Sequence, residues 1–163
     1  MFKYADDTYL LIPASMSYSV PHELENIASW ADNNNLKLNL TKSKEMIIHG
    51  NSRSSAEPAP TPNIPRVNSM VILGIIISSN LSMDTHITNL AASANSSSYA
   101  LQTLKRMGMK SERVWNVCRA TLISRLVYGS PAWRGFANLS LLNRLEALIR
   151  RAKRQWPSQG KPA

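Results

Sequence analysis

Cysteine is almost absent from this 163-residue sequence, which holds only Cys118. A single thiol excludes an internal disulfide framework and a cysteine-based zinc site, and it fits a reducing intracellular compartment, nucleus or cytoplasm. The histidines, His22, His49 and His86, are too far apart in the sequence to form a cluster with metal-ligand spacing. Long apolar runs are also missing. The longest, residues 70–77, is far below the roughly 20 residues of a membrane helix, so we expect no membrane partner.

Acidic residues are scarce and unevenly placed, with 10 Asp and Glu against 19 Lys and Arg and a formal net charge of +9. Residues 1–90 hold six basic and eight acidic residues, a net of −2, whereas residues 91–163 hold 13 and two, a net of +11. An acidic half joined to a basic half is typical of nucleic-acid enzymes. The alternative is that the basic residues only solvate helix surfaces, which so lopsided a ratio disfavours.

Two adjacent carboxylates lie between β-prone runs at the start of the chain. Residues 2–4 and 8–12 flank Ala5, Asp6 and Asp7, and this pattern predicts a β-hairpin with the three residues at its tip. Neighbouring carboxylates repel each other unless a cation lies between them, and Mg²⁺ is a hard cation that takes carboxylate oxygens. The alternative is an acidic turn that binds no metal.

Tyr4-Ala5-Asp6-Asp7 resembles the Tyr-x-Asp-Asp box of reverse transcriptases. Alanine in the second place resembles the version found in non-LTR (LINE-type) retrotransposons. The resemblance implies that Asp6 and Asp7 are catalytic carboxylates that bind Mg²⁺ in the complete enzyme. It also implies that Tyr4 and Ala5 support them.

Hydrophobic periodicity predicts the elements of the first half. Apolar residues at helical spacing predict a helix over residues 21–33, which three consecutive asparagines end. Alternating leucines predict a strand over residues 36–40, and a short apolar run predicts another over residues 46–49. Residues 50–65, rich in Ser and Pro, indicate a loop. Residues 67–77 indicate a buried strand pair or hairpin.

Two further stretches extend the resemblance. The segment that ends in Lys42-Ser43 is similar to the fourth palm motif of these polymerases, which implies that Lys42 protonates the leaving pyrophosphate. Lys44 is a rival by register, and a solvated turn lysine is the plain alternative. Leu73-Gly74 resembles the Leu-Gly element that helps to hold the primer strand, although an ordinary core strand with a glycine bulge fits the same residues.

The second half reads as helical. Apolar spacing predicts helices from residue 84 to the stop at Gly108, over residues 111–128, and over residues 139–153. Residues 128–133 are similar to the Tyr-x-Ser-Pro-x-Trp stretch found downstream of the polymerase in these elements. The arginines that we expect to contact nucleic acid are Arg119, Arg125, Arg144, Arg150, Arg151 and Arg154.

The expected fold is therefore α+β. Residues 1–80 form a partial reverse transcriptase palm with the Tyr-Ala-Asp-Asp hairpin, residues 81–154 a helical thumb and connection region, and residues 155–163 a disordered tail. The resemblance implies a C-terminal palm and thumb fragment of an RNA-directed DNA polymerase, a nucleotidyltransferase whose partners are an RNA template and a DNA primer.

The family's third Asp and its fingers belong upstream, to the missing N-terminal polymerase portion of the full-length element. We therefore expect the isolated chain to be inactive. Two alternatives stay open: a non-enzymatic, basic nucleic-acid-binding remnant, and a translation product with no function.

Overall fold

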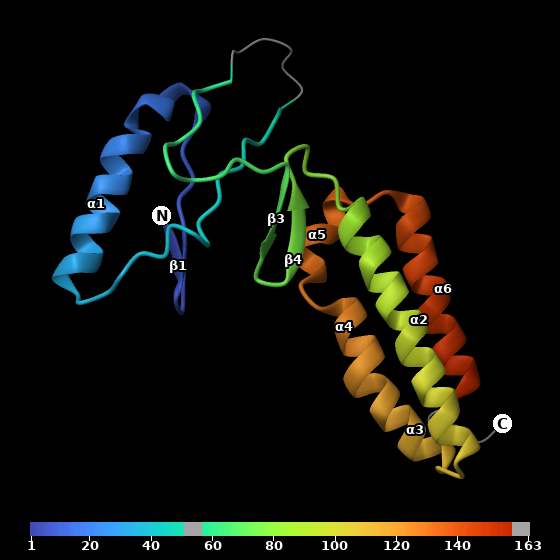
Figure 1. Cartoon of the computed structure of the whole chain (residues 1–163). Helices are drawn as coiled ribbons and strands as arrows, with labels where there is room; N and C mark the ends of the chain where they lie inside the picture. The colour runs from blue at the N-terminus through green and yellow to red at the C-terminus, as the bar shows by residue number, and fades with distance from the viewer. Residues whose placement is uncertain (51–56, 158–163) are drawn as a thin grey trace. The chain divides into compact units, whose positions relative to one another are not determined.

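The computed structural model describes residues 1–50 and 57–157, and it has a mixed α+β fold, as expected. The β structure consists of antiparallel two-stranded hairpins, and most of the rest is helical (Figure 1). The chain divides into two compact parts, residues 1–68 and residues 69 onward, which we call the N-terminal unit and the helical unit. No helix in these described ranges combines the length and apolar character needed to cross a membrane.

The N-terminal unit begins with the predicted hairpin. Its elements are β1 (Phe2–Tyr4), β2 (Asp7–Tyr9), the 3-10 helix η1 (Ala14–Ser19) and α1 (Val20–Asn33). The helix confirms the prediction for residues 21–33, with a proline in its first turn. Asn35 has a φ of 55°, the left-handed geometry that asparagine tolerates, and this residue follows the end of the helix.

The two strands predicted after α1 are not formed. Residues 36–40 are irregular, and residues 46–49 belong to no strand; nearby, Glu45 makes a single isolated bridge with Arg66. Alternation shows which side chains share a face, but a strand also needs a partner that accepts its backbone hydrogen bonds. In the described residues no strand pairs with the leucines at 36, 38 and 40, the Leu36 N–H donates to the Ala31 carbonyl of α1 instead, and the three side chains stay 39–48% exposed.

The helical unit consists of a hairpin followed by packed helices. Its elements are β3 (Ser69–Ile72), β4 (Ile75–Ser78), α2 (Asp84–Arg106), α3 (Ser111–Cys118), the π-helical segment η2 (Arg119–Ile123), α4 (Ser124–Val127), α5 (Ser130–Trp133), the 3-10 turn η3 (Arg134–Phe136) and α6 (Leu139–Gln155). The long helix α2 packs against α6 on one side and against α3 and α4 on the other (Figure 1). The three predicted helices are thus present.

One hydrophobic core holds this unit together. Its buried apolar residues are Met83, Ile87, Ala91, Ala94, Leu101, Val114, Cys118, Leu122, Leu126, Trp133, Leu145, Ala152 and Trp156. Burial raises the pKa of the Cys118 thiol, which packs in this core as a small apolar residue. Trp156 is 2% exposed and Gln155 still belongs to α6, so ordered structure continues past residue 154. Residues 158–163 of the expected tail lie outside the described residues.

The helix predicted over residues 111–128 contains a π-helical segment, η2. Hydroxyl groups in and beside it bond to carbonyl oxygens four residues earlier: Thr121 donates to Val117 at 2.7 Å, and Ser124 donates to Ala120. Such back-bonding competes with the regular ladder and bends helices. The wider turn rotates Arg119 relative to Arg125, so these arginines do not follow the spacing of one regular helix.

The β3–β4 hairpin belongs to the helical unit, although the expected boundary was near residue 80. Ile75 and Ile77 pack against the helical core. Val71 and Ile76 form a non-hydrogen-bonded pair next to the turn, so the Ile76 N–H points to the outer edge of the hairpin. There it donates to Nδ1 of His86 on α2 at 3.4 Å. These contacts attach the hairpin to the helices.

His86 is the buried polar side chain at this attachment, 5% exposed. Because Nδ1 accepts a hydrogen bond, the neutral imidazole carries its proton on Nε2, which has no hydrogen-bond partner among the described residues. The ring meets Trp133 edge-on, with ring centroids 5.7 Å apart. Burial lowers the pKa of His86, because a charged imidazole would lose its hydration there.

This environment predicts a loss of stability in mild acid. Below about pH 6.5 His86 is protonated in the unfolded chain but stays neutral in the folded chain, because its pKa there is lower. The free energy of unfolding therefore falls as the pH drops from about 6.5 to the lowered pKa of the folded chain. Above that range His86 contributes no pH dependence. Urea denaturation followed by circular dichroism, at about pH 7.5 and about pH 5.5, measures the difference.

The matched variant is His86→Gln, whose side-chain oxygen can still accept from Ile76 but does not titrate. It should flatten the pH dependence of unfolding, whereas His22→Gln, on the exposed surface of α1, should leave it as in the wild type. An unchanged pH dependence in His86→Gln would show that His86 is not the group responsible.

Candidate functional site

The acidic pair lies at the tip of the β1–β2 hairpin. Tyr4 pairs with Asp7, so the turn consists of Ala5 and Asp6, and Asp7 is the first residue of β2. Ala5 has a φ of 49°, a left-handed geometry that costs roughly 1–2 kcal/mol for a residue with a Cβ. Such local strain is common at functional sites and in tight turns.

The pairing register decides which way the hairpin faces. Phe2, Tyr4 and Asp7 share one face, because Tyr4 pairs with Asp7 and Phe2 with Tyr9, and Lys3 lies on the other face. The Lys3 ammonium lies 4.2 Å from the centroid of the Trp30 ring on α1, a cation–π contact. This contact joins the Lys3 side chain to α1, and the register places the Asp7 carboxylate on the opposite face of the hairpin.

The carboxylates themselves are exposed. The Tyr9 hydroxyl donates to Asp7 Oδ2 at 3.2 Å, and Asp6 and Asp7 are both open to solvent. Two hard oxygen donors at one hairpin tip suit Mg²⁺, but they supply only part of its octahedral shell. Within the described ranges no group of three or more His, Cys, Asp or Glu side chains is arranged to hold a metal ion. The donor set fits Mg²⁺ in part, and water would have to supply the other ligands.

Lys42 lies in a hydrogen-bonded turn instead of after a strand. Its backbone N–H donates to the Asn39 carbonyl at 3.1 Å and to the Asn39 side chain at 3.2 Å, and the Ser43 hydroxyl donates to the same carbonyl at 3.1 Å. The side chains of Lys42 and Lys44 are exposed. No ion pair in the described residues joins Lys42 to Asp6 or Asp7, so its catalytic role stays a prediction.

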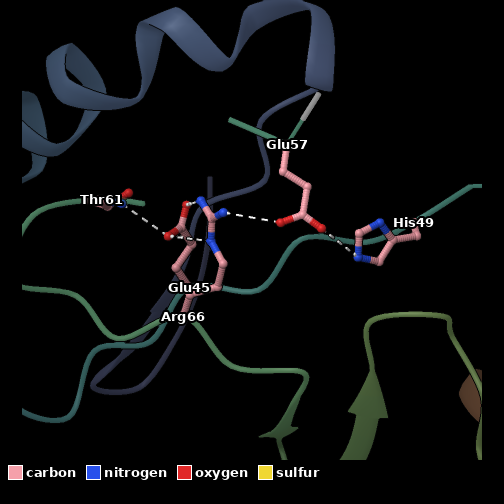
Figure 2. A network of polar contacts seen from close by, with 5 residues as sticks. All are labelled: Glu45, His49, Glu57, Thr61 and Arg66. Carbon is pink, nitrogen blue, oxygen red and sulfur yellow. Dashed lines mark hydrogen bonds and ion pairs between the residues drawn. The ribbon is translucent and has the colours of Figure 1, made fainter. Parts of the chain in front are cut away.

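A polar network that we did not predict holds together the chain that follows this turn (Figure 2). The Arg66 guanidinium donates to both carboxylate oxygens of Glu45, at 3.1 and 3.3 Å, and the Thr61 N–H donates to Glu45 at 3.2 Å. Arg66 also lies 3.5 Å from Glu57, which lies 3.6 Å from His49. Burial acts to raise the pKa of Glu45, but the hydrogen bonds from Arg66 and Thr61 outweigh it and lower that pKa.

In the helical unit, Leu73-Gly74 forms the turn of the β3–β4 hairpin and not a bulge inside a strand. Ile72 pairs with Ile75, and both turn residues have positive φ, 48° for Leu73 and 82° for Gly74. Positive φ at both central positions is the requirement of a type I′ turn, whose twist matches that of the strands. Glycine meets this requirement without cost, whereas leucine is strained.

The same turn meets the segment after α4, which the sequence marked only by resemblance. The Tyr128 hydroxyl donates to the Leu73 carbonyl oxygen at 3.0 Å. Gly129, with a φ of 60°, lies so close to Ile75 that a Cβ there would come within 2.7 Å of the Ile75 Cδ1 atom. Trp133 Nε1 donates to the Tyr128 carbonyl at 2.9 Å. Two motifs that are 55 residues apart in the sequence thus form one site.

The arginines of α6 share one face of that helix. Arg144 and Arg151 are seven residues apart, Arg151 and Arg154 three, and Arg150 and Arg154 four, spacings that place side chains near one another on an α-helix. All of them are exposed, while Leu145 and Ala152 on the other side of α6 are buried. This exposed band, which we call the α6 arginine face, matches the charge of a phosphate backbone.

Arg119 and Arg125 differ in their surroundings. Both are exposed, but the Arg125 guanidinium donates to the Ser93 hydroxyl on α2. One bond leaves most of the five guanidinium donors of Arg125 free for another acceptor. The residues predicted to act together are therefore distributed over both units: Asp6, Asp7 and Lys42 in the N-terminal unit, and Leu73, Gly74 and the arginines in the helical unit.

Comparison with known proteins adds no assignment. No family model, no curated protein and no solved structure matches the chain.

Proposed function

We propose that this chain is a palm and thumb fragment of a non-LTR retrotransposon reverse transcriptase and that its helical unit binds RNA–DNA hybrids. The family assignment rests on the resemblance of Tyr4-Ala5-Asp6-Asp7. The observation that supports it best is the hairpin itself, in which both carboxylates stand exposed at the tip and Asp7 lies on the face opposite Lys3. A nucleotide could reach this tip, because both aspartates are open to solvent.

The chemistry of the complete enzyme would need more than this chain supplies. Polymerases of this type use two metal ions about 4 Å apart, bridged by carboxylates, to stabilise the attacking and leaving oxygens. Asp6 and Asp7 would be two of the ligands, and bound Mg²⁺ would supply the charge stabilisation. Phe2 and Tyr4, each 64% exposed on the same face of the hairpin as Asp7, suit packing against another part of a larger palm.

The 163-residue chain alone should not polymerise. Two exposed carboxylates hold Mg²⁺ weakly, and the described residues offer no third metal-binding carboxylate beside them. Primer extension on poly(rA)–oligo(dT) with purified protein and Mg²⁺ is expected to give no product above the background without protein.

Two variants distinguish incorporation by this chain from incorporation by a contaminating polymerase. Asp6→Asn removes one hairpin carboxylate, and Asp32→Asn removes an acidic side chain from α1. Incorporation that Asp6→Asn abolishes and Asp32→Asn preserves would contradict the proposal that the chain is an incomplete enzyme. Incorporation that both variants preserve would come from a contaminant.

A second function, binding without catalysis, is favoured by a separate observation. The α6 arginine face belongs to the helical unit, whereas Asp6 and Asp7 belong to the N-terminal unit, and residues 91–163 carry a net charge of +11. Charge of this kind binds a phosphate backbone whatever its base sequence. Binding through α6 therefore needs neither Asp6 nor Asp7, and the two functions can be tested independently.

A further inference from the structure

Tyr128 stands out among the aromatic residues of the helical unit because its ring is exposed and yet held in place. The residue is 57% exposed, although its hydroxyl donates to the Leu73 carbonyl oxygen at 3.0 Å. Its backbone carbonyl also accepts from Trp133 Nε1 at 2.9 Å, and Trp133 is buried. An exposed tyrosine normally samples several rotamers, whereas this one is fixed at both its hydroxyl and its backbone.

The residue of the turn that lies beside the edge of the ring is a glycine. A Cβ at Gly74 would lie 3.5 Å from the Tyr128 Cε1 atom, so the ring edge lies next to a position that carries no side chain. Leu73 keeps a left-handed φ of 48°, and strained residues of this kind cluster at ligand sites. One edge of the ring therefore lies beside the turn, while the residue as a whole stays 57% exposed.

Arg125 lies three residues before Tyr128, in the short helix α4 that Tyr128 follows directly. The Tyr128 N–H donates to the Arg125 carbonyl at 3.4 Å, so the two residues belong to the same turn. The Arg125 guanidinium is itself held by the Ser93 hydroxyl of α2. A cation and an aromatic ring, each held by a hydrogen bond of its own, are thus both exposed within three residues of the chain.

From this arrangement we propose that Tyr128 and Arg125 form a contact site for an unpaired or terminal nucleotide of a nucleic-acid strand. The Tyr128 ring stacks on the base, and the Arg125 guanidinium binds the neighbouring phosphate. Stacking on an aromatic ring tolerates any base, because every base has a π-face, and a fixed ring loses little entropy on binding. This site deepens the proposed nucleic-acid binding and depends on it.

The test uses the full chain and an RNA–DNA hybrid with a short single-stranded overhang, compared with the same hybrid carrying abasic nucleotides in the overhang. Wild type should bind the abasic form about 5- to 150-fold more weakly, the range expected for one stacked base. Tyr128→Leu removes the ring and should bind both hybrids equally weakly. Tyr128→Phe keeps the ring and should retain most of the discrimination.

Tyr99→Leu is the matched control, because Tyr99 is 69% exposed on α2 but is not part of this site. It should discriminate as wild type does, and circular dichroism should show all variants folded. A 5-iodouracil placed in the overhang should cross-link to Tyr128 on irradiation.

The outcomes separate this site from the broader function. Equal wild-type binding to base-containing and abasic overhangs, with salt-dependent binding intact, would overturn the site and leave the proposed function standing. Absence of any binding to either hybrid would overturn both.

Discussion

Trp133→Ala should destabilise the helical unit by about 3–5 kcal/mol, the usual cost of truncating a buried aromatic residue. Trp133 is 3% exposed, meets His86 edge-on, and donates to the Tyr128 carbonyl through Nε1. Truncation therefore leaves a cavity and an unpaired carbonyl where the β3–β4 hairpin joins the helices. A loss of this size is a large part of the 5–15 kcal/mol by which domains are typically stable.

Thermal unfolding followed by the helical circular-dichroism signal measures this effect. The midpoint should fall by more than about 12 °C, taking about 4 °C per kcal/mol for a unit of this size. Trp30→Ala is the control of the same residue type. Trp30 is 45% exposed and contributes a cation–π contact with Lys3 in the other unit, so the midpoint of the helical unit should hardly move. Equal melting of Trp133→Ala and wild type would show that Trp133 is not a core residue.

Replacing the whole α6 arginine face by glutamine should have the largest effect on binding. If Arg144, Arg150, Arg151 and Arg154 each meet one phosphate, their loss should weaken binding of an RNA–DNA hybrid by roughly 10³-fold near 0.1 M salt and flatten the salt slope by about three. The weakening should be the same for all sequences, since phosphate contacts carry no base information.

A charge-matched pair of double variants separates local contact from net charge. Arg150→Gln with Arg151→Gln removes two charges from α6, and Lys37→Gln with Lys44→Gln removes two from exposed positions in the N-terminal unit. The arginine pair should flatten the salt slope by up to about two, and the lysine pair should change it little. Equal effects of the two pairs would mean that overall charge, and not the α6 arginine face, drives binding.

The sequence predicted best those elements whose signals are local. The helix over residues 21–33 has a proline at its start and asparagines at its end, and α6 has an uninterrupted apolar stripe, so both were found. The hairpin at Asp6 and Asp7 was found because turn residues separate two β-prone runs. Each of these signals lies within a few residues of the element that it predicts.

Elements and contacts that depend on distant partners could not be predicted in this way. The leucines at 36–40 alternate as a strand does, but alternation does not reveal whether another strand lies beside them. The hydrogen bond from Tyr128 to Leu73 joins residues 55 positions apart, and the pair of Arg66 with Glu45 joins residues 21 apart. Only the fold brings such residues together, which is why Tyr128 and Glu45 had no predicted role.

Binding of an RNA–DNA hybrid by the full chain, measured by fluorescence anisotropy at two salt concentrations, tests the proposed nucleic-acid function most directly. With about four to six phosphates neutralised, the logarithm of the association constant should fall with the logarithm of salt concentration at a slope near −3 to −5. Affinity should be insensitive to the base sequence of the hybrid. Equally negligible binding at both salt concentrations would contradict the proposal that the helical unit binds nucleic acid.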